Sequence, residues 1–328
     1  MTDAPPSDPA CETDDPDAYC AAIAARNGSP LWLVGRSLPP VKRRFFAATY
    51  ASMRLIDDFV DTAFLPLPPA ERAALRPAAL ERLDEWRAGV EAAARGMCTK
   101  MQGPEAPVFR ALAAVLPRTD LGVAPWQALL RALRRDIEER PIDDWDGFLD
   151  YCEGATVAPA MVFIYILGSR EEAGTFRWTL PEPPSFYASD ITVFCYLVHI
   201  LRDLVEDSKG DSQLLTIPRS ALSDLSLSPA RLQDAIRKGE TAKVERLIRI
   251  LADEAQRYRD GADRRLDQLG TLIDPTELCL LMALYRAYTA LHDRILAQPD
   301  AVLQDPDGLR GLQRATLSQA MALTDGHT

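Results

Sequence analysis

Apolar residues recur at the three- and four-residue spacing of a helix along almost the whole chain, and few segments alternate as strands do. The clearest run extends from Val41 to Thr62, directly after two prolines that favour a helix start. Its apolar face holds Phe45, Phe46, Thr49, Met53, Ile56 and Val60. Further helices are predicted over residues 70–95, 125–140, 145–167, 185–208, 229–238, 241–269, 275–297 and 306–323. The pattern predicts an all-α fold.

The connections between these helices are short and rich in proline, as at residues 65–69 and 181–184. No shift in composition divides the chain, and 328 residues with 47% hydrophobic content can bury one large core. The first 20 residues differ, because acidic side chains there repel one another and prolines block a helix. We therefore expect a disordered acidic tail at residues 1–20 and one helical domain over residues 21–328.

The formal net charge of −11 argues against a nucleic acid partner, which would need clustered Lys and Arg. We find no apolar run of the roughly 20 residues that cross a bilayer and no basic start of a secretory signal. A cytoplasmic protein is expected, with at most transient, peripheral contact with membranes. The six cysteines form no Cys-x-x-Cys pair, which disfavours a disulfide framework or a thiolate zinc site.

Two short acidic clusters fall on different predicted helices. Asp57 and Asp61 are four residues apart, and Asp203 and Asp207 repeat that spacing. Residues four apart lie on one helix face, about 5–6 Å between Cβ atoms, and like charges there destabilise an isolated helix. A cation explains two such pairs, and Mg²⁺ is the natural candidate because it prefers carboxylate, water and phosphate oxygens.

An isolated acidic pair is ordinarily a solvated helix face, so the surroundings of the clusters matter. Both clusters end apolar helical runs, residues 45–60 and 191–205, which are typical of buried helices. Arg54 precedes the first cluster and Arg202 precedes the second. An arginine keeps its charge and offers a donor fork that suits a diphosphate. The two clusters together therefore favour a metal–diphosphate site.

Three stretches resemble the squalene/phytoene synthase family, whose members join two prenyl diphosphates head to head. Residues 50–61, Tyr-Ala-Ser-Met-Arg-Leu-Ile-Asp-Asp-Phe-Val-Asp, are similar to the family's first aspartate-rich helix. Residues 199–207, His-Ile-Leu-Arg-Asp-Leu-Val-Glu-Asp, are similar to its second, usually Asn-Ile-Leu-Arg-Asp-x-x-Glu-Asp. Residues 136–154 resemble the segment that leads to the Tyr-Cys helix of the family. Together the stretches cover roughly residues 30–220 in the family's order.

The resemblance implies a fold, a reaction and a set of residues. The fold would be a single-domain class I isoprenoid synthase helical bundle with a central active-site cavity. The reaction would be a Mg²⁺-dependent condensation of two farnesyl or geranylgeranyl diphosphates, through a cyclopropylcarbinyl diphosphate, to a squalene-, dehydrosqualene- or phytoene-type product. The implied metal ligands are Asp57, Asp61, Asp203 and Asp207. The implied substrate-binding residues are Arg54, Asp58, Arg202, Glu206 and Lys209, and the implied catalytic residues are Tyr50, Arg54 and Arg202.

The sequence departs from the family pattern at several positions. His199 replaces the usual asparagine and Tyr196 the usual glutamine. We retain His199 as a candidate metal ligand, although imidazole prefers softer metals than Mg²⁺. A family phosphate-binding segment is represented only by residues 27–31, and residues 213–218 lack the usual arginine and tyrosine. Lys209 is a candidate to replace one lost contact.

The pocket is outlined by small and aromatic residues. Residues 154–161 are mostly small and include Pro159, so we expect a kink or local unwinding where an isoprenoid chain approaches the backbone. Tight helix packing explains the same run equally well. Carbocations survive where water is excluded, and the candidates for the apolar wall are Phe163, Tyr165, Ile166, Phe186, Phe194 and the aromatic residues of the helix predicted from Val41 to Thr62.

Two other functions stay open at this point. His199, Asp203 and Asp207 have the spacing of the metal triad of class I terpene cyclases, which favours a cyclase or an atypical prenyltransferase using one prenyl diphosphate. A helical scaffold that kept the fold and lost turnover is the non-enzymatic alternative. The sequence specifies neither the substrate chain length nor the oligomeric state, and it does not indicate NADPH, which reducing members of the family use.

Overall fold

The computed structural model describes residues 15–26, 29–97, 103–211 and 216–325. The first half of the chain forms α1 (Pro16–Ala25), α2 (Pro30–Gly35), α3 (Pro40–Asp58), α4 (Pro69–Ala94), α5 (Ala106–Val115), α6 (Ala124–Ile137), α7 (Trp145–Cys152) and α8 (Ala158–Gly168). The second half forms α9 (Pro184–Asp207), α10 (Arg219–Ser223), α11 (Pro229–Lys238), α12 (Thr241–Gly270), α13 (Pro275–Ala297), α14 (Ala301–Gln304) and α15 (Pro306–Asp325). The prediction of an all-α fold is confirmed.

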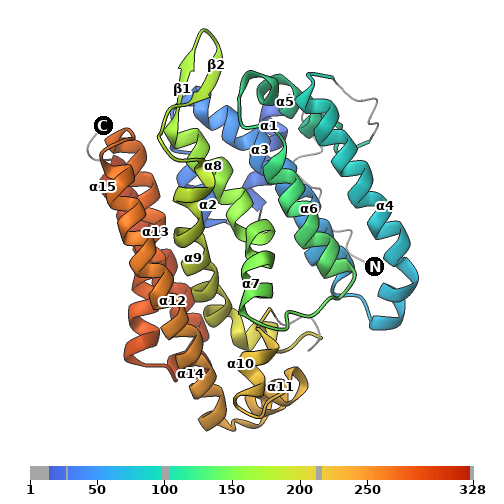
Figure 1. The fold of residues 1–328 in the computed structure, drawn as a ribbon, viewed down its shortest axis with the longest axis vertical. Helices are drawn as coiled ribbons and strands as arrows, with labels where there is room; N and C mark the ends of the chain where they lie inside the picture. Colours follow the sequence, from blue (N-terminus) through green and yellow to red (C-terminus); the bar gives the residue numbers. More distant parts are fainter. Residues whose placement is uncertain (1–14, 27–28, 98–102, 212–215, 326–328) are drawn as a thin grey trace, which may run out of the picture.

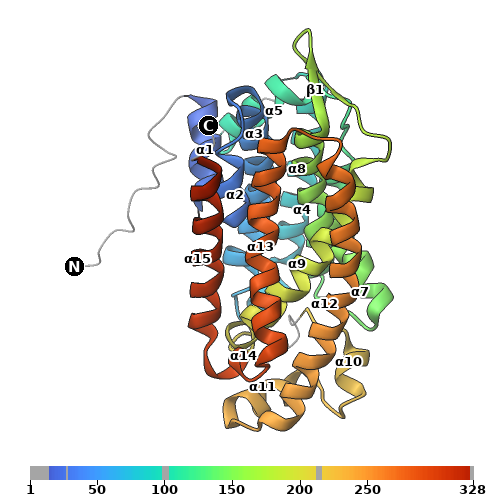
Figure 2. The same cartoon turned by 90° about the vertical axis from the view of Figure 1, so that its left-hand side faces the viewer.

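The long helices pack in layers around α8 and α9. Helices α12, α13 and α15 gather at one side of the molecule, and α4 and α6 lie at the opposite side (Figure 1). Turned by 90°, the view shows α15, α13 and α12 side by side across one face (Figure 2). Helix α9 packs extensively against α12 and also contacts α8 and α13. This central position half-buries Asp203 near the end of α9, while Glu206 and Asp207 at the end of the helix are exposed.

Prolines set the start of most helices, as the sequence predicted. Helices α3, α4, α9, α13 and α15 all begin at a proline, whose fixed φ suits the first turn and whose missing N–H would be unpaired there anyway. Asp274 also caps α13, since its Oδ1 accepts a hydrogen bond of 2.8 Å from the backbone N–H of Thr276. Local chemistry therefore accounts for these boundaries.

The predicted disordered tail, residues 1–20, includes the start of a helix. Helix α1 occupies residues 16–25, and Asp15 caps it by accepting a hydrogen bond of 3.0 Å from the N–H of Asp17. Tyr19 and Cys20 are buried in the core. The acidic and proline-rich composition concealed this short helix, which packs against α3 and α5. Residues 1–14 of the predicted tail lie outside the described residues.

A short hairpin follows α8 that the helical pattern did not indicate. Strands β1 (Ser169–Glu172) and β2 (Thr175–Trp178) pair antiparallel, and Ala173 and Gly174 turn between them with φ of 51° and 79°. Two positive-φ residues form a tight turn whose twist matches the strands. The Asp120 carboxylate accepts hydrogen bonds from Tyr165 Oη at 2.6 Å and from the N–H of Trp178 at 3.1 Å. These contacts fasten the hairpin to the bundle.

One helical run in the described part of the chain is long and apolar enough to cross a membrane, judged by length and composition alone. It spans residues 145–168, where α7, the π-helical turn η5 (Glu153–Val157) and α8 follow one another without a break. The expectation that no apolar run of the chain reaches this length is therefore wrong. In the structure, 67% of the most apolar window is buried inside the protein, as in the core helix of a bundle.

Two π-helical turns widen the helices near the middle of the fold. The first, η3 (Phe59–Phe64), extends α3, and the second is η5. The predicted local unwinding within residues 154–161 is therefore confirmed. Gly154 lies in η5 against α6, and a Cβ placed there would lie 2.3 Å from the carbonyl oxygen of Ala128. The small residues thus permit close helix packing, and π turns often accompany functional sites.

Candidate active site

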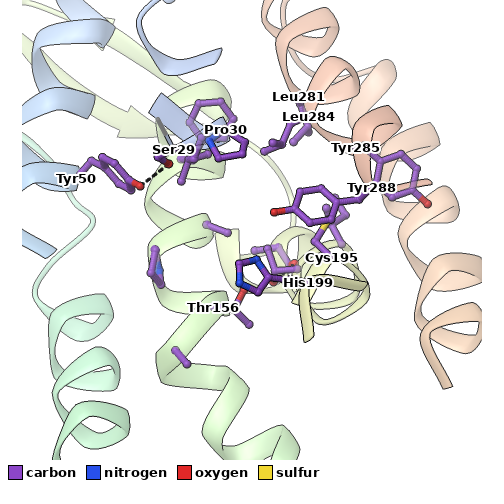
Figure 3. Close-up of a pocket in the computed structure, with 18 of the residues that line it drawn as sticks. Ser29, Pro30, Tyr50, Thr156, Cys195, His199, Leu281, Leu284, Tyr285 and Tyr288 are labelled. Atoms are coloured by element: carbon purple, nitrogen blue, oxygen red, sulfur yellow. Dashed lines mark hydrogen bonds between the residues drawn. The ribbon is translucent and has the colours of Figure 1, made fainter. Parts of the chain in front are cut away.

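A cavity of about 560 Å³ lies between α2, α3, α8, α9, α13 and α15. Figure 3 shows lining residues that converge on it, with Tyr50 of α3 on one side and Tyr285 and Tyr288 of α13 on the other. Apolar side chains make up much of the wall, including Met53, Leu129, Phe163, Ile164, Ile191, Leu281 and Leu284. Charged groups also reach the wall, namely Arg54, Asp57, Arg202, Arg310 and Arg314. The cavity therefore offers apolar volume beside a charged region.

Only part of the predicted apolar wall lies at the cavity. Phe163 lines it, but Tyr165, Ile166, Phe186 and Phe194 are not among its lining residues. These four residues occupy other positions around their helices. The Tyr165 hydroxyl donates to Asp120, Phe194 packs against the ring of Tyr285, and Phe186 lies beneath the guanidinium of Arg265. Other positions on α8 and α9 that do face the cavity include Ala160, Ile164, Ile191 and Cys195.

Arg54 organises the first acidic cluster at the end of α3. Its Nη1 donates to Asp57 at 3.0 Å, and its Nη2 donates to Asp58. Desolvation raises the pKa of Asp57, against the opposing charge of Arg54. Desolvation, together with the charges of Asp57 and Asp136, raises the pKa of Asp61 to about 8. These carboxylates repel one another strongly enough to favour a bound cation.

Asp136 on α6 is a third carboxylate of this region, and it was absent from the predicted metal ligands. The Tyr151 hydroxyl donates to its Oδ2 at 3.1 Å. Desolvation, with the charge of Asp57, raises the pKa of Asp136 to about 7. Asp136 lies within residues 136–154, which resemble a segment of the family. That resemblance does not show that Asp136 lies beside the first acidic cluster.

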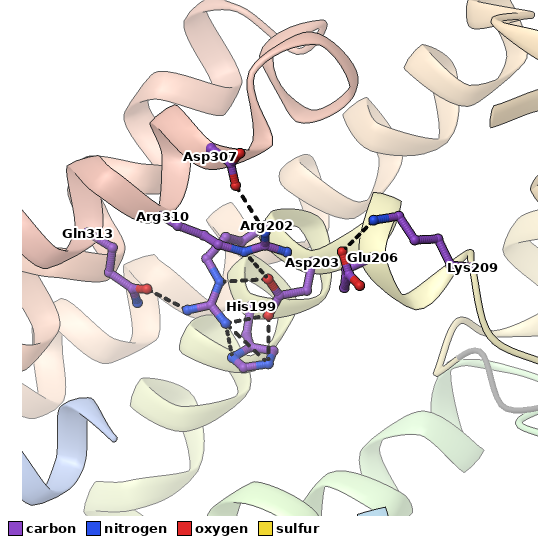
Figure 4. Close-up of polar contacts among 8 residues, drawn as sticks. All are labelled: His199, Arg202, Asp203, Glu206, Lys209, Asp307, Arg310 and Gln313. Atoms are coloured by element: carbon purple, nitrogen blue, oxygen red, sulfur yellow. Dashed lines mark hydrogen bonds and ion pairs between the residues drawn. The ribbon is translucent and has the colours of Figure 1, made fainter. Parts of the chain in front are cut away.

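The second acidic cluster lies at the end of α9 beneath α15 (Figure 4). Asp203 Oδ1 accepts hydrogen bonds from Arg202 Nε at 3.0 Å and from Arg310 Nε at 3.2 Å. Desolvation alone would raise the pKa of Asp203, but hydrogen bonds from Arg202 outweigh it and lower this pKa. Desolvation and the charge of Asp203 raise the pKa of Asp207 to about 6. Asp203 is therefore an anion held by two arginines.

His199 faces the cavity as a neutral imidazole. Its Nδ1 lies 3.2 Å from Arg202 Nη2, and its Nε2 lies 3.2 Å from Asp203 Oδ2. Desolvation and the charge of Arg202 lower the pKa of His199 to about 4. Its ring stacks on Tyr196, with 6.2 Å between centroids. The two departures from the family pattern are thus in contact with each other and with the second cluster.

The predicted catalytic Tyr50 lies on the cavity wall opposite the second cluster. Its hydroxyl and the Ser29 hydroxyl are 2.7 Å apart and share a hydrogen bond (Figure 3). Ser29 belongs to the predicted phosphate-binding segment, of which residues 27 and 28 lie outside the described residues. The structure therefore brings this segment and Tyr50 together at one wall.

Glu206 and Lys209 do not line the cavity, although the sequence analysis had named them as substrate-binding candidates. Lys209 Nζ donates to Glu206 Oε2 at 2.7 Å, and both side chains are more than half exposed. Glu206 lies in the last turn of α9, and Lys209 lies two residues beyond the end of that helix. Asp58 likewise lies beside the cavity and not on its wall, paired with Arg54.

Helix α15 supplies residues that sequence reasoning missed. Arg310 and Gln313 both line the cavity, and Gln313 Oε1 accepts a hydrogen bond from Arg202 Nη1. Gln313 is 4% exposed. Nothing in the local pattern of α15 distinguishes these two polar residues from its exposed ones, because their role depends on the packing of α15 against α9.

In the described residues, no group of three or more His, Cys, Asp or Glu side chains is arranged as a ready metal site. The arginines hold the carboxylates instead, Arg54 on the first cluster and Arg202 and Arg310 on the second. The donor set nevertheless fits a hard divalent cation, because the mutually repelling carboxylates Asp57, Asp61 and Asp136 supply only oxygen ligands.

Solved structures and curated proteins resemble this chain over most of its length. A squalene synthase from Alicyclobacillus acidocaldarius superposes with a TM-score of 0.66 at 21% identity, covering 86% of this chain and 94% of that one. A dehydrosqualene synthase in complex with a ligand gives 0.67 at 18% identity, covering 95% and 97%. These likenesses show a shared fold.

Among curated proteins, the phytoene synthase of Arthrospira platensis is 24% identical over 258 residues, 77% of each chain. The phytoene synthase of Mycobacterium tuberculosis is 25% identical over 287 residues, 87% of this chain and 83% of that one. A family model described as squalene/phytoene synthase matches residues 25–320. The resemblance of the three motif stretches therefore extends through the C-terminal helices, and this chain is a prenyltransferase that belongs to the squalene/phytoene synthase family.

Proposed function

We propose that this protein joins two farnesyl or geranylgeranyl diphosphates head to head in a Mg²⁺-dependent reaction. The product would be of the squalene, dehydrosqualene or phytoene type and would form through a cyclopropylcarbinyl diphosphate. The observation that carries the proposal is that Arg54, which pairs with Asp57 of α3, and Arg202, which pairs with Asp203 of α9, both reach the wall of one apolar cavity. A long isoprenoid chain and a diphosphate need this combination of surfaces.

The reaction would begin with departure of one diphosphate, which takes the electron pair of its C–O bond and leaves an allylic cation. The double bond of the second substrate then attacks that cation, and the new cation loses a proton as the cyclopropane ring closes. Arg54, Arg202 and Arg310 reach the cavity wall and would stabilise the negative charge of the departing diphosphate. Magnesium, when bound by the acidic clusters, would add Lewis-acid stabilisation of the same charge.

Other residues would protect and orient the reacting groups. Apolar side chains from α8, α9 and α13 would exclude water from the cation. The Tyr50 hydroxyl, fixed by Ser29, would orient a diphosphate at the opposite wall. His199 is neutral and held by Arg202 and Asp203, so it would present an uncharged polar edge where relatives present an amide.

Incubation of the purified protein with C15 and with C20 prenyl diphosphates tests the proposal directly. We expect a C30 or C40 product, identified by mass spectrometry, that requires Mg²⁺ and disappears with a chelator. Parallel reactions with and without NADPH would show whether the final carbocation is reduced. A cyclic product from one prenyl diphosphate would instead support a terpene cyclase, and absence of turnover with either substrate would contradict the proposal.

Mg²⁺ binding is expected to strengthen as the pH rises. In the folded protein the pKa of Asp61 is about 8 and that of Asp136 about 7, above the value of about 4 for an unfolded aspartate. The folded state therefore binds extra protons, so the metal-free protein should lose stability as the pH rises from 6 to 8. Mg²⁺ should offset this loss because it replaces those protons.

Urea unfolding at pH 6, 7 and 8, with and without Mg²⁺, measures both effects. The free energy of unfolding of the metal-free protein should fall over this range, and the stabilisation by Mg²⁺ should grow. Asp61→Asn removes the group with the highest of these pKa values, so it should flatten the metal-free pH dependence. An Asp61→Asn variant with the same pH dependence as the unmodified protein would exclude Asp61 as its origin.

A further inference from the structure

Arg72 is an almost fully buried cation that lies outside the cavity wall and the predicted motifs. It is 1% exposed on α4. Its Nε donates to Glu139 Oε1 at 2.7 Å, and its Nη2 donates to Asp211 Oδ2 at 2.5 Å. Its Nη1 donates to the carbonyl oxygens of Leu65 at 3.2 Å and Leu67 at 2.6 Å. One guanidinium thus engages three segments that are distant in sequence.

Each of these segments directly follows a carboxylate of the candidate site. Leu65 and Leu67 come after Asp61, at the end of η3, and Glu139 comes after Asp136, at the end of α6. Asp211 comes after Asp207, just beyond the end of α9. The guanidinium itself contacts none of the candidate metal ligands; it holds the chain a few residues beyond each one.

Further contacts anchor the same segments. Arg76, one turn along α4, donates to the carbonyl of Ile137 at 2.9 Å and to Glu139 Oε1 at 3.0 Å. Glu139 adopts a φ of 54°, a conformation that is uncommon for a residue with a side chain. Gln233 Nε2 donates to the carbonyl of Gly210 at 2.9 Å. The segments after α6 and α9 are therefore held in defined positions, with Arg72 as their shared partner.

We propose that Arg72 is a positioning residue that sets the spacing between the segments carrying Asp61, Asp136 and Asp207, and thereby the affinity for a Mg²⁺–diphosphate complex. The inference rests on the proposed function, because it assumes that these carboxylates bind the metal. Groups that orient metal ligands from outside typically change metal affinity by about 10- to 100-fold when they are altered.

The chemistry of the guanidinium explains why arginine suits this position. Its planar fork carries five donors in fixed directions, so it can satisfy four acceptors from three segments at once. A lysine ammonium has three donors on one atom and cannot span the same acceptors. Burial of an unpaired charge is strongly unfavourable, so the three segments must close around Arg72 for its charge to be compensated.

The test compares Asp211→Ala and Arg72→Lys with a control variant, Glu277→Ala. Glu277 accepts from Lys42 Nζ at 2.8 Å, and this pair is also well shielded, with side-chain exposures of 6% and 16%. Lys42 lies fifteen residues before Asp57 on α3, about 22 Å along the helix at 1.5 Å per residue. Loss of this pair should reduce stability without altering the spacing of the carboxylates.

Binding of Mg²⁺ with inorganic diphosphate is measured by calorimetry, and the melting temperature is measured for each variant. We expect Arg72→Lys to weaken Mg²⁺–diphosphate binding by about 10- to 100-fold and Asp211→Ala, which removes one of four acceptors, to weaken it less, while Glu277→Ala stays within about twofold. The melting temperature should fall for all three. If all three variants lose stability but only the Asp211 and Arg72 variants lose affinity, Arg72 acts as a positioning residue.

Two outcomes would overturn the inference in distinguishable ways. If the Asp211 and Arg72 variants bind Mg²⁺–diphosphate as the unmodified protein does, while their melting temperatures fall like that of Glu277→Ala, Arg72 only stabilises the fold. If the unmodified protein itself shows no Mg²⁺-dependent diphosphate binding, the proposed function fails and the inference fails with it.

Discussion

Asp203→Ala should lower kcat by about 100- to 1000-fold, the scale on which a single charged or hydrogen-bonding group stabilises a transition state. The expected loss is large because Asp203 has two roles. It is a candidate metal ligand, and it accepts hydrogen bonds from Arg202 and Arg310, which both reach the cavity. The variant would leave both guanidinium groups free to change orientation. Steady-state turnover of the preferred prenyl diphosphate measures the effect.

Asp293→Ala is the matched control for this variant. Asp293 on α13 also accepts a hydrogen bond from an arginine, Arg259, but neither residue lines the cavity. We expect its turnover to stay within about twofold of the unmodified protein, since single surface ion pairs contribute only about 0–1 kcal/mol to stability. Turnover by Asp203→Ala at the rate of this control would remove Asp203 from the reaction.

Gly154→Ala should destabilise the protein by about 1–3 kcal/mol, the usual consequence of adding a methyl group to a closely packed core. The new Cβ would lie 2.3 Å from the carbonyl oxygen of Ala128 and 2.8 Å from the Cβ of Ala132. The first of these is backbone and cannot rotate away, so η5 and α6 must separate. The midpoint of urea unfolding should fall accordingly.

Gly311→Ala provides a control with the opposite expected sign. Gly311 lies inside α15, and a Cβ placed there meets nothing within 4 Å. Alanine is favoured over glycine in a helix by about 0.5–1 kcal/mol, so this variant should be slightly stabilised. If both variants changed stability by the same amount, the tight contact at Gly154 would not be the cause.

The sequence predicted those parts of the fold whose chemistry is local. Helix α9 was expected over residues 185–208 and occupies Pro184–Asp207; α12 was expected over 241–269 and occupies Thr241–Gly270. Proline starts, caps and helical periodicity act over a few residues and can be read directly. Helix α1 escaped the same reasoning because its four buried residues directly follow an acidic, proline-rich segment.

For the candidate site too, the features that lie within one helix could be predicted, and those that depend on helix packing could not. The acidic clusters and their arginines could be named in advance because each lies within one helix. Asp136, Arg310 and Gln313 reach the site from α6 and α15, and no short-range pattern shows which face of α6 will meet η3 or which face of α15 will meet α9. For the same reason the predicted aromatic wall was mostly wrong, since one helical position changes direction by about 100°.

The π-helical turn η3 makes the spacing of the first acidic cluster unusually dependent on chain length. A π turn holds more residues than an α turn, since its hydrogen bonds reach five residues back and not four. Deletion of Phe59 would allow an ordinary α-helix to form in its place, at little penalty to the backbone. The same deletion would bring Asp61 to three residues after Asp57, so the two carboxylates would stay on one helix face with a different angle between them. A chain of this family could thus retain its fold through a one-residue deletion at η3 and present both carboxylates to one ligand in an altered geometry.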